Sequence, residues 1–138
     1  MTLGVTLAAD GGSWSSISDR NAKDNYKPID GQQVLDKLAK VPVATWNYKG
    51  QDPSIRHIGP VAQDFHAAFG VGEDDKHITT VDADGVALAA IKGLHEIVKQ
   101  KDARIAAQEE EMSALRARLA KLEAIVSNLA DTKNGGAR

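Results

Sequence analysis

The stretch IKGLHEIVKQKDARIAAQEEEMSALRARLAKLEAIVSNL, residues 91–129, decides the fold because its apolar residues recur with a heptad period. With Ile91 at heptad position a, the register runs through six heptads without a break. Such a repeat is typical of coiled coils, because it keeps positions a and d on one seam. The predicted apolar core residues are Ile91, Leu94, Val98, Ile105, Met112, Leu115, Leu119, Leu122, Val126 and Leu129.

The charges around this seam indicate a parallel arrangement. Opposite charges stand at g and the following e position, the spacing that couples neighbouring parallel helices. These pairs are Arg104 with Glu109, Glu111 with Arg116, and Arg118 with Glu123. Lys101 and Gln108 are polar residues at d, which cost stability but can specify register and oligomer state. The a and d residues do not by themselves decide between a dimer and a trimer.

The length of the helix favours association over packing within one chain. No proline interrupts residues 86–130, so the rod is roughly 60 Å long at 1.5 Å per residue. That is too long to bury its apolar stripe on the small remainder of the chain. The alternative is a single amphipathic helix that folds back on its own domain.

Composition excludes several function classes. The chain has 138 residues with 42% hydrophobic and only 4% aromatic residues, which predicts one domain with a thin core. A net charge of −2 argues against a nucleic-acid or membrane-surface binder held by charge. The N-terminus has neither a basic lead nor a long apolar run, so we expect no secretory signal and no membrane span.

We expect no metal site and no cofactor. Cysteine is absent, which removes disulfides and thiolate chemistry. The four histidines, His57, His66, His77 and His95, are scattered at spacings that form no paired metal-ligand motif.

Short elements are expected before the rod. Residues 1–17 predict a hairpin around Asp10-Gly11-Gly12, and residues 32–41 carry helical spacing that Pro42 closes. Residues 43–49 alternate as a strand, whereas residues 55–69 predict a short strand followed by a helix after Pro60. Residues 70–85 are rich in loop formers, with a short strand expected at residues 77–82.

Several segments together resemble one family. They are SDRNAKDNYKPI at residues 18–29, VLDKLAKVPVATWNYK at residues 34–49, HIGPVAQDF at residues 57–65, and VDADGVALAAIKGLHEI at residues 81–97. In this order, before a terminal coiled coil, they resemble the C-terminal intramolecular chaperone domain of phage endosialidase tailspikes and tail fibres. That self-cleaving domain also occurs in the myelin regulatory factor. The resemblance covers residues 18–129, and Pro60 departs from the bulky apolar residue that is more usual there.

The resemblance implies an α+β fold with a small mixed head and a parallel trimeric coiled coil. Residues 1–17 would end an upstream fibre or spike segment, and residues 18–86 would form the chaperone and autoprotease head. Residues 87–130 would be the stalk and residues 131–138 a disordered tail. The implied function is to drive trimerisation and folding of the upstream segment, and then to cut between Ile17 and Ser18.

The same resemblance assigns Ser18 as the nucleophile and Lys23 as its base. A lysine can take the serine proton only when its amine is neutral, and burial favours the neutral form. A junction of three chains could supply that burial. Residues five apart on an α-helix point about 140° apart, so either the chain turns between Ser18 and Lys23 or Lys23 meets the serine of another chain.

Asp19, His57 and Gly59 are candidate supporting residues. Asp19 suits a helix cap, His57 suits a structural hydrogen bond, and Gly59 suits a backbone geometry closed to other residues. We expect the oxyanion donors to be backbone N–H groups of the Gly11-Gly12 turn or of residues 57–60. Cleavage could pass through an ester or through a serine-activated water.

Other functions remain open at this point. The chain could be a trimerisation cap that stays attached to its fibre, or a coiled-coil adaptor with a dimeric stalk. A diffusible hydrolase is the weakest alternative, because no motif suggests a substrate pocket. The expected partners are two further copies of the chain and the upstream segment of the same polypeptide, not nucleic acid or a membrane. The expected location is the host cytoplasm during assembly, with the parent protein in the phage virion tail.

Overall fold

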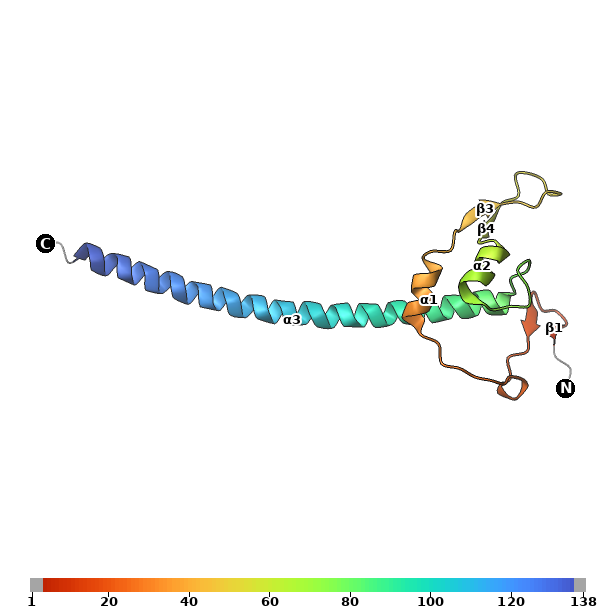
Figure 1. The fold of residues 1–138 in the computed structure, drawn as a ribbon, viewed down its shortest axis with the longest axis horizontal. Helices are drawn as coiled ribbons and strands as arrows, with labels where there is room; N and C mark the ends of the chain where they lie inside the picture. Colours follow the sequence, from red (N-terminus) through yellow and green to blue (C-terminus); the bar gives the residue numbers. More distant parts are fainter. Residues whose placement is uncertain (1–3, 136–138) are drawn as a thin grey trace. The chain divides into compact units, whose positions relative to one another are not determined.

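A computed structural model describes residues 4–135 as an α+β chain (Figure 1). Two antiparallel strand pairs, one 3-10 turn and two short helices precede one long helix. The predicted class, with short strands and a long C-terminal helix, is confirmed. The chain divides into two units between His95 and Glu96, and the long helix α3 runs through this division.

The first strand pair is the expected N-terminal hairpin. Strand β1 (Val5–Leu7) pairs antiparallel with β2 (Trp14–Ser16). Between them the Gly11 N–H donates to the Ala8 carbonyl over 2.9 Å, and Asp10 has a φ of 60°. Asp is among the few residues that tolerate this left-handed conformation, so the turn lies where the sequence predicted it.

Helix α1 (Gly31–Leu38) begins at a side-chain cap. The Asp30 carboxylate accepts from the backbone N–H groups of Gln32 at 2.9 Å and Gln33 at 3.1 Å, which satisfies donors that a helix start leaves unpaired. Val34 is the buried residue of this helix. Turn-type hydrogen bonds then carry the chain to Val41, which is also buried.

The second strand pair and helix α2 also follow the sequence. Strand β3 (Ala44–Trp46) pairs antiparallel with β4 (His57–Gly59). Helix α2 (Ala62–Phe69) ends at Gly70, which is left-handed with a φ of 63° and donates to the His66 carbonyl. Glycine is the usual residue for such a helix end, because it has no Cβ to clash.

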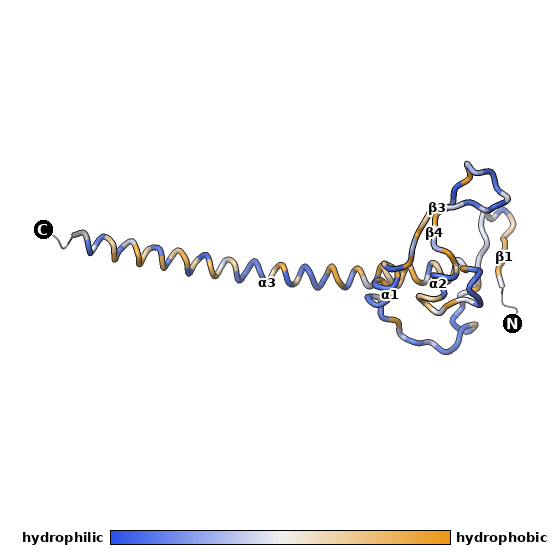
Figure 2. The backbone as a smooth tube through the Cα atoms, turned by 45° about the horizontal axis from the view of Figure 1, so that its top comes forward, coloured by the Kyte–Doolittle hydropathy of each residue, from blue (hydrophilic) through white to orange (hydrophobic). Residues whose placement is uncertain are grey.

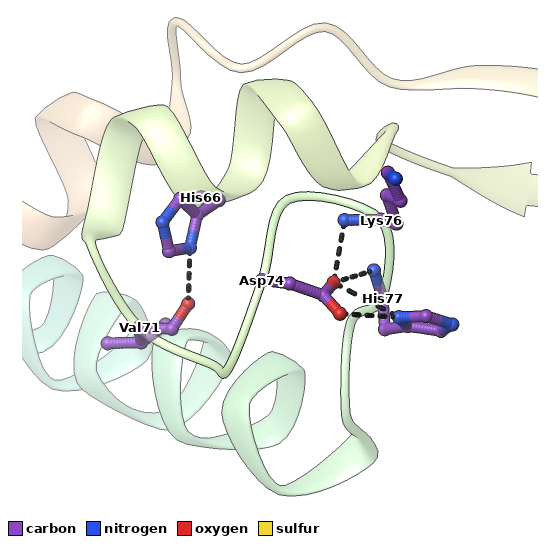
Figure 3. A network of polar contacts seen from close by, with 5 residues as sticks. All are labelled: His66, Val71, Asp74, Lys76 and His77. Atoms are coloured by element: carbon purple, nitrogen blue, oxygen red, sulfur yellow. Dashed lines mark hydrogen bonds and ion pairs between the residues drawn. The ribbon is translucent and has the colours of Figure 1, made fainter.

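A polar network orders the loop between α2 and α3 (Figure 3). The His66 ring Nδ1 lies 3.0 Å from the Val71 carbonyl oxygen. The Asp74 carboxylate accepts from the backbone N–H groups of Lys76 and His77, and the His77 ring Nδ1 lies 2.9 Å from Asp74 Oδ2. The hydrogen bond from the Lys76 backbone, followed by that from the His77 side chain, holds the pKa of Asp74 below its ordinary value.

The strand expected at residues 77–82 is wrong. Helix α3 (Thr80–Gly135) begins there, because Thr79 and Asp82 cap each other. The Asp82 N–H donates to Thr79 Oγ1 over 3.1 Å, and that hydroxyl donates to Asp82 Oδ2 over 2.7 Å. This reciprocal arrangement resembles a capping box, and it outweighs the β propensity of the two threonines.

The core of the first unit is small and helical. It joins one residue of α1, one of α2 and three of α3, which are Val34, Phe65, Val86, Ala89 and Ala90. The Phe65 and Phe69 rings pack with centroids 5.0 Å apart. Within residues 4–135 no large side chain is completely buried, in keeping with the low aromatic content.

Two glycines allow α1 to approach α3 at this core. A Cβ on Gly93 would lie 2.7 Å from the Gln32 N and closer still to the Gly31 carbonyl, and a Cβ on Gly31 would lie 2.7 Å from the Ala89 carbonyl oxygen. Real Cβ atoms essentially never approach so closely. The crossing therefore depends on the absence of a side chain at both positions.

The second unit holds the part of α3 that follows His95. Along it, hydrophilic and hydrophobic residues alternate in short blocks (Figure 2). The ten apolar a and d residues of α3, from Ile91 to Leu129, are 46% to 65% exposed in the single chain. The helix runs on past residue 130, the expected end of the stalk, to Gly135, so the expectation of a disordered tail at residues 131–138 is wrong for residues 131–135. The remainder of that expected tail, residues 136–138, lies outside the described residues. None of the helices between residues 4 and 135 has the length and apolar character of a bilayer span.

Candidate active site

Ser18 and Lys23 are joined by a hydrogen bond. The Lys23 ammonium nitrogen Nζ lies 2.7 Å from Ser18 Oγ, and both side chains are exposed in the single chain. They stand five positions apart in sequence, a spacing that puts two side chains on different faces of an α-helix. Local backbone structure must therefore bring them together.

The turn η1 (Arg20–Ala22) is that structure. It is a single 3-10 turn, in which the Ala22 N–H donates to the Asp19 carbonyl over 3.1 Å and the Lys23 N–H to the Arg20 carbonyl over 3.3 Å. With three residues per turn, the chain folds back tightly enough for the lysine to reach the serine. The turn is thus made within one chain and needs no neighbouring copy.

Asp19 holds the start of this turn. Its carboxylate Oδ1 accepts from the Asn21 backbone N–H over 2.9 Å and from the Asn21 side-chain amide over 3.2 Å. The capping role considered for Asp19 and the approach of Lys23 to Ser18 are therefore parts of one structure. Asn21 was not among the candidate residues, although an Asp followed two residues later by Asn is a recognisable turn signal.

The bond between Ile17 and Ser18 lies in the short connection between β2, which ends at Ser16, and η1, which begins at Arg20. The Ile17 N–H donates to the Gly4 carbonyl over 3.3 Å, one step beyond β2. The Ile17 side chain is 39% exposed. The hairpin thus holds the residue before this bond, and the hydrogen bond with Lys23 holds the side chain of the residue after it.

His57 is occupied elsewhere. Its ring Nε2 lies 3.0 Å from Gln51 Oε1, and the ring packs against Trp46 and Tyr48 with centroids 4.8 Å and 5.6 Å apart. These contacts agree with a structural histidine on the β3–β4 pair. The hydrogen bonds described for Ser18 and Lys23 do not include this ring.

The backbone expectation for Gly59 is wrong. Gly59 lies in β4 opposite Ala44 and is not among the described glycines with positive φ. A Cβ there would approach only Trp46 Nε1, at 4.0 Å. Any residue can adopt the extended backbone of a strand, so the φ angle does not explain why glycine stands at position 59.

Two of the expected oxyanion donors are not free. The Gly11 N–H already donates to the Ala8 carbonyl, and Pro60 has no N–H. An oxyanion formed at Ile17 therefore cannot use either of these two positions.

Comparison with known proteins agrees with the motifs. A search of curated proteins found no match to the chain. Residues 18–71 match the model of a family that is classed among the peptidases and described as "Chaperone of endosialidase". This is the family that the sequence motifs resemble, so the expected resemblance is confirmed over residues 18–71.

Proposed function

We propose that this chain is a homotrimeric intramolecular chaperone that releases itself from an upstream fibre or spike segment by cutting between Ile17 and Ser18. The observation that carries the proposal is the 2.7 Å hydrogen bond between Lys23 Nζ and Ser18 Oγ. The family match supports it, because the matched segment starts at residue 18, directly after the proposed scissile bond. The parent protein would belong to a phage virion tail, and assembly would take place in the host cytoplasm.

The reaction begins with proton transfer. Neutral Lys23 takes the proton from Ser18 Oγ as that oxygen attacks the Ile17 carbonyl carbon. The bond from this carbon to the Ser18 nitrogen then breaks, and the Lys23 ammonium returns the proton to that nitrogen. The products are an ester between Ile17 and Ser18 Oγ and a free Ser18 amine.

Water completes the cleavage. It attacks the ester carbonyl while Lys23, neutral again, accepts its proton. The upstream segment leaves with a carboxylate on Ile17, and the proton returns to Ser18 Oγ. In the second possible route, the serine hydroxyl and Lys23 activate water for direct attack on the amide, without an ester.

Trimerisation would act as the switch. Ser18 and Lys23 are exposed in the single chain, and water favours the charged ammonium. Covering the site with neighbouring chains would remove that water and favour the neutral amine. The half-exposed a and d residues of α3 and the three g-to-e charge pairs support a parallel trimeric stalk as the source of the neighbours.

Mass spectrometry of the expressed chain tests the cleavage. We expect the wild type to lose residues 1–17, and Ser18→Ala and Lys23→Ala to remain intact. Ser16→Ala is the matched control, because Ser16 precedes the scissile bond and belongs to β2. Intact wild-type chains in a sample shown to be trimeric by sedimentation would contradict the proposal.

The exposure of both side chains favours a second candidate, a trimerisation cap that is never cut. Such a cap needs the same stalk but no dry site. It predicts a trimer whose chain length does not depend on Ser18. The same mass measurement therefore separates the two functions.

A further inference from the structure

The middle of the stalk holds two adjacent charged residues that have no partner in the g-to-e charge pairs. Lys101 is the one charged residue among the core positions a and d between residues 91 and 129, and Asp102 follows it at position e. The other acidic or basic residues at e, from Glu109 onward, each have an opposite charge five residues earlier at g. For Asp102 that g position holds Ile97, which is apolar.

The single chain does not pair these two charges. Lys101 and Asp102 are exposed, and the one ion pair within residues 4–135 joins His77 and Asp74. Lys99 stands three residues before Asp102 on the same helix, at a spacing that permits an ion pair, yet the two form none. The two leftover charges thus remain available to another chain.

Parallel coiled-coil geometry brings the two charges together between chains. A side chain at d inserts into a hole formed by four residues of the neighbouring helix. In a parallel, in-register stalk, that hole includes the neighbour's d residue and the e residue beside it. Lys101 of one chain therefore lies beside Asp102 of the next.

We propose that Lys101 of each chain forms an ion pair with Asp102 of a neighbouring copy, and that the resulting ring of three pairs specifies the register of the stalk. This inference rests on the trimer proposed above. A buried charge without a partner is strongly destabilising, so registers that separate the two residues are disfavoured. The pair contributes specificity more than stability.

The ring excludes a slip by one heptad. Each helix of the trimer can be displaced along the axis relative to the next one. Because the three helices form a closed ring, these three displacements sum to zero, and a slip in one direction at one interface requires a slip in the opposite direction at another. At that interface Lys101 meets His95, the e residue of the preceding heptad, instead of Asp102. At least one ammonium would then lack its carboxylate.

A double-mutant cycle in the full chain tests the pair, with all variants in the Ser18→Ala background and at one protein concentration. Asp102→Asn should lower the thermal midpoint by a few degrees, because it leaves Lys101 unpaired. Lys101→Leu should raise the midpoint, because it removes the buried charge. The double variant Lys101→Leu with Asp102→Asn should then have the same midpoint as Lys101→Leu alone. Glu110→Gln is the matched control at the outward f position and should have no effect in either background.

Disulfide trapping tests the register. Since the chain has no cysteine, chains with Leu115→Cys can be mixed with chains with Leu122→Cys. A disulfide between the two requires Cα atoms about 6 Å apart, whereas one heptad spans about 10 Å. In chains that retain Lys101, we expect disulfides only between two cysteines at position 115 or between two at position 122. Once Lys101 is replaced by leucine, we expect disulfides between positions 115 and 122 as well.

The outcomes separate this inference from the proposed function. Equal effects of Asp102→Asn in both backgrounds, in a chain that sediments as a trimer, would overturn the ion pair alone. Mixed disulfides in the presence of Lys101 would overturn its role in register. A chain that remains monomeric at high concentration would overturn the trimer and the ion pair together.

Discussion

Replacing Gly93 with alanine should destabilise the helical core, although alanine is the better helix former. In a helix interior, alanine is favoured over glycine by about 1 kcal/mol. At Gly93 the new Cβ would meet the Gly31 carbonyl and lie 2.7 Å from the Gln32 N. These are backbone atoms, which cannot rotate away as a side chain would.

The steric cost should therefore exceed the gain in propensity. Relieving the overlap requires α1 to move away from α3, which loosens the packing of Val34 in the core cluster that it shares with α3 residues. Overpacking of this kind costs about 1–3 kcal/mol. We expect a net loss of up to about 2 kcal/mol in the free energy of unfolding.

Gly85 supplies the matched control in the same helix. A Cβ built there meets nothing within 4 Å, so Gly85→Ala should stabilise the chain by about 0.5–1 kcal/mol. Both variants are compared with wild type by thermal unfolding followed by circular dichroism, at one protein concentration. If the two substitutions shift the midpoint in the same direction, the close approach of α1 to α3 is refuted.

Four further predictions concern the turn at the candidate site and the loop before α3. Lys23→Arg should keep a cation beside the serine but abolish cleavage, because arginine does not deprotonate in proteins; a cut product by mass spectrometry would exclude lysine as the base. Asp19→Ala should destabilise η1 by about 1 kcal/mol, because it removes the cap of the turn. This loss should slow cleavage about fivefold in a time course, and an unchanged rate would show that the cap does not position the lysine. Thr79→Ala should lower the free energy of unfolding by about 1 kcal/mol, because it removes the cap of α3. Denaturant unfolding measures this loss, and an unchanged midpoint would contradict the capping role. The lowered pKa of Asp74 means that its contribution to stability is present at neutral pH and is lost as the pH falls below about 4. The difference in thermal midpoint between wild type and Asp74→Asn should therefore shrink on acidification, and a difference that stays constant with pH would contradict this.

Local signals accounted for most of the secondary structure. The turn formers Asp10 and Gly11, the helical spacing around Val34 and the left-handed end at Gly70 act within a few residues, so the hairpin, α1 and α2 lie close to where they were expected. The strand predicted at residues 77–82 failed because β propensity competed with a cap. The Thr79 and Asp82 side chains satisfy the first donors of α3, a contribution that a propensity argument does not include.

The candidate site depended on structure in a different way. The sequence could name Ser18 and Lys23 only through a family resemblance, since a serine and a lysine five residues apart occur often by chance. Their spacing left two arrangements open, a turn within the chain or a contact with another chain. The 3-10 turn capped by Asp19 brings the two side chains together in one chain.

The heptad pattern of residues 91–129 determined by itself that this chain carries a long amphipathic helix, because the period of apolar residues is a property of the sequence alone. Only the tertiary structure decided that α1 crosses α3 at Gly31 and Gly93. The physical reason is the range of the interactions. Caps, turns and helical periods act between residues a few positions apart, whereas the crossing joins glycines far apart in sequence, whose lack of a side chain matters only where two backbones meet.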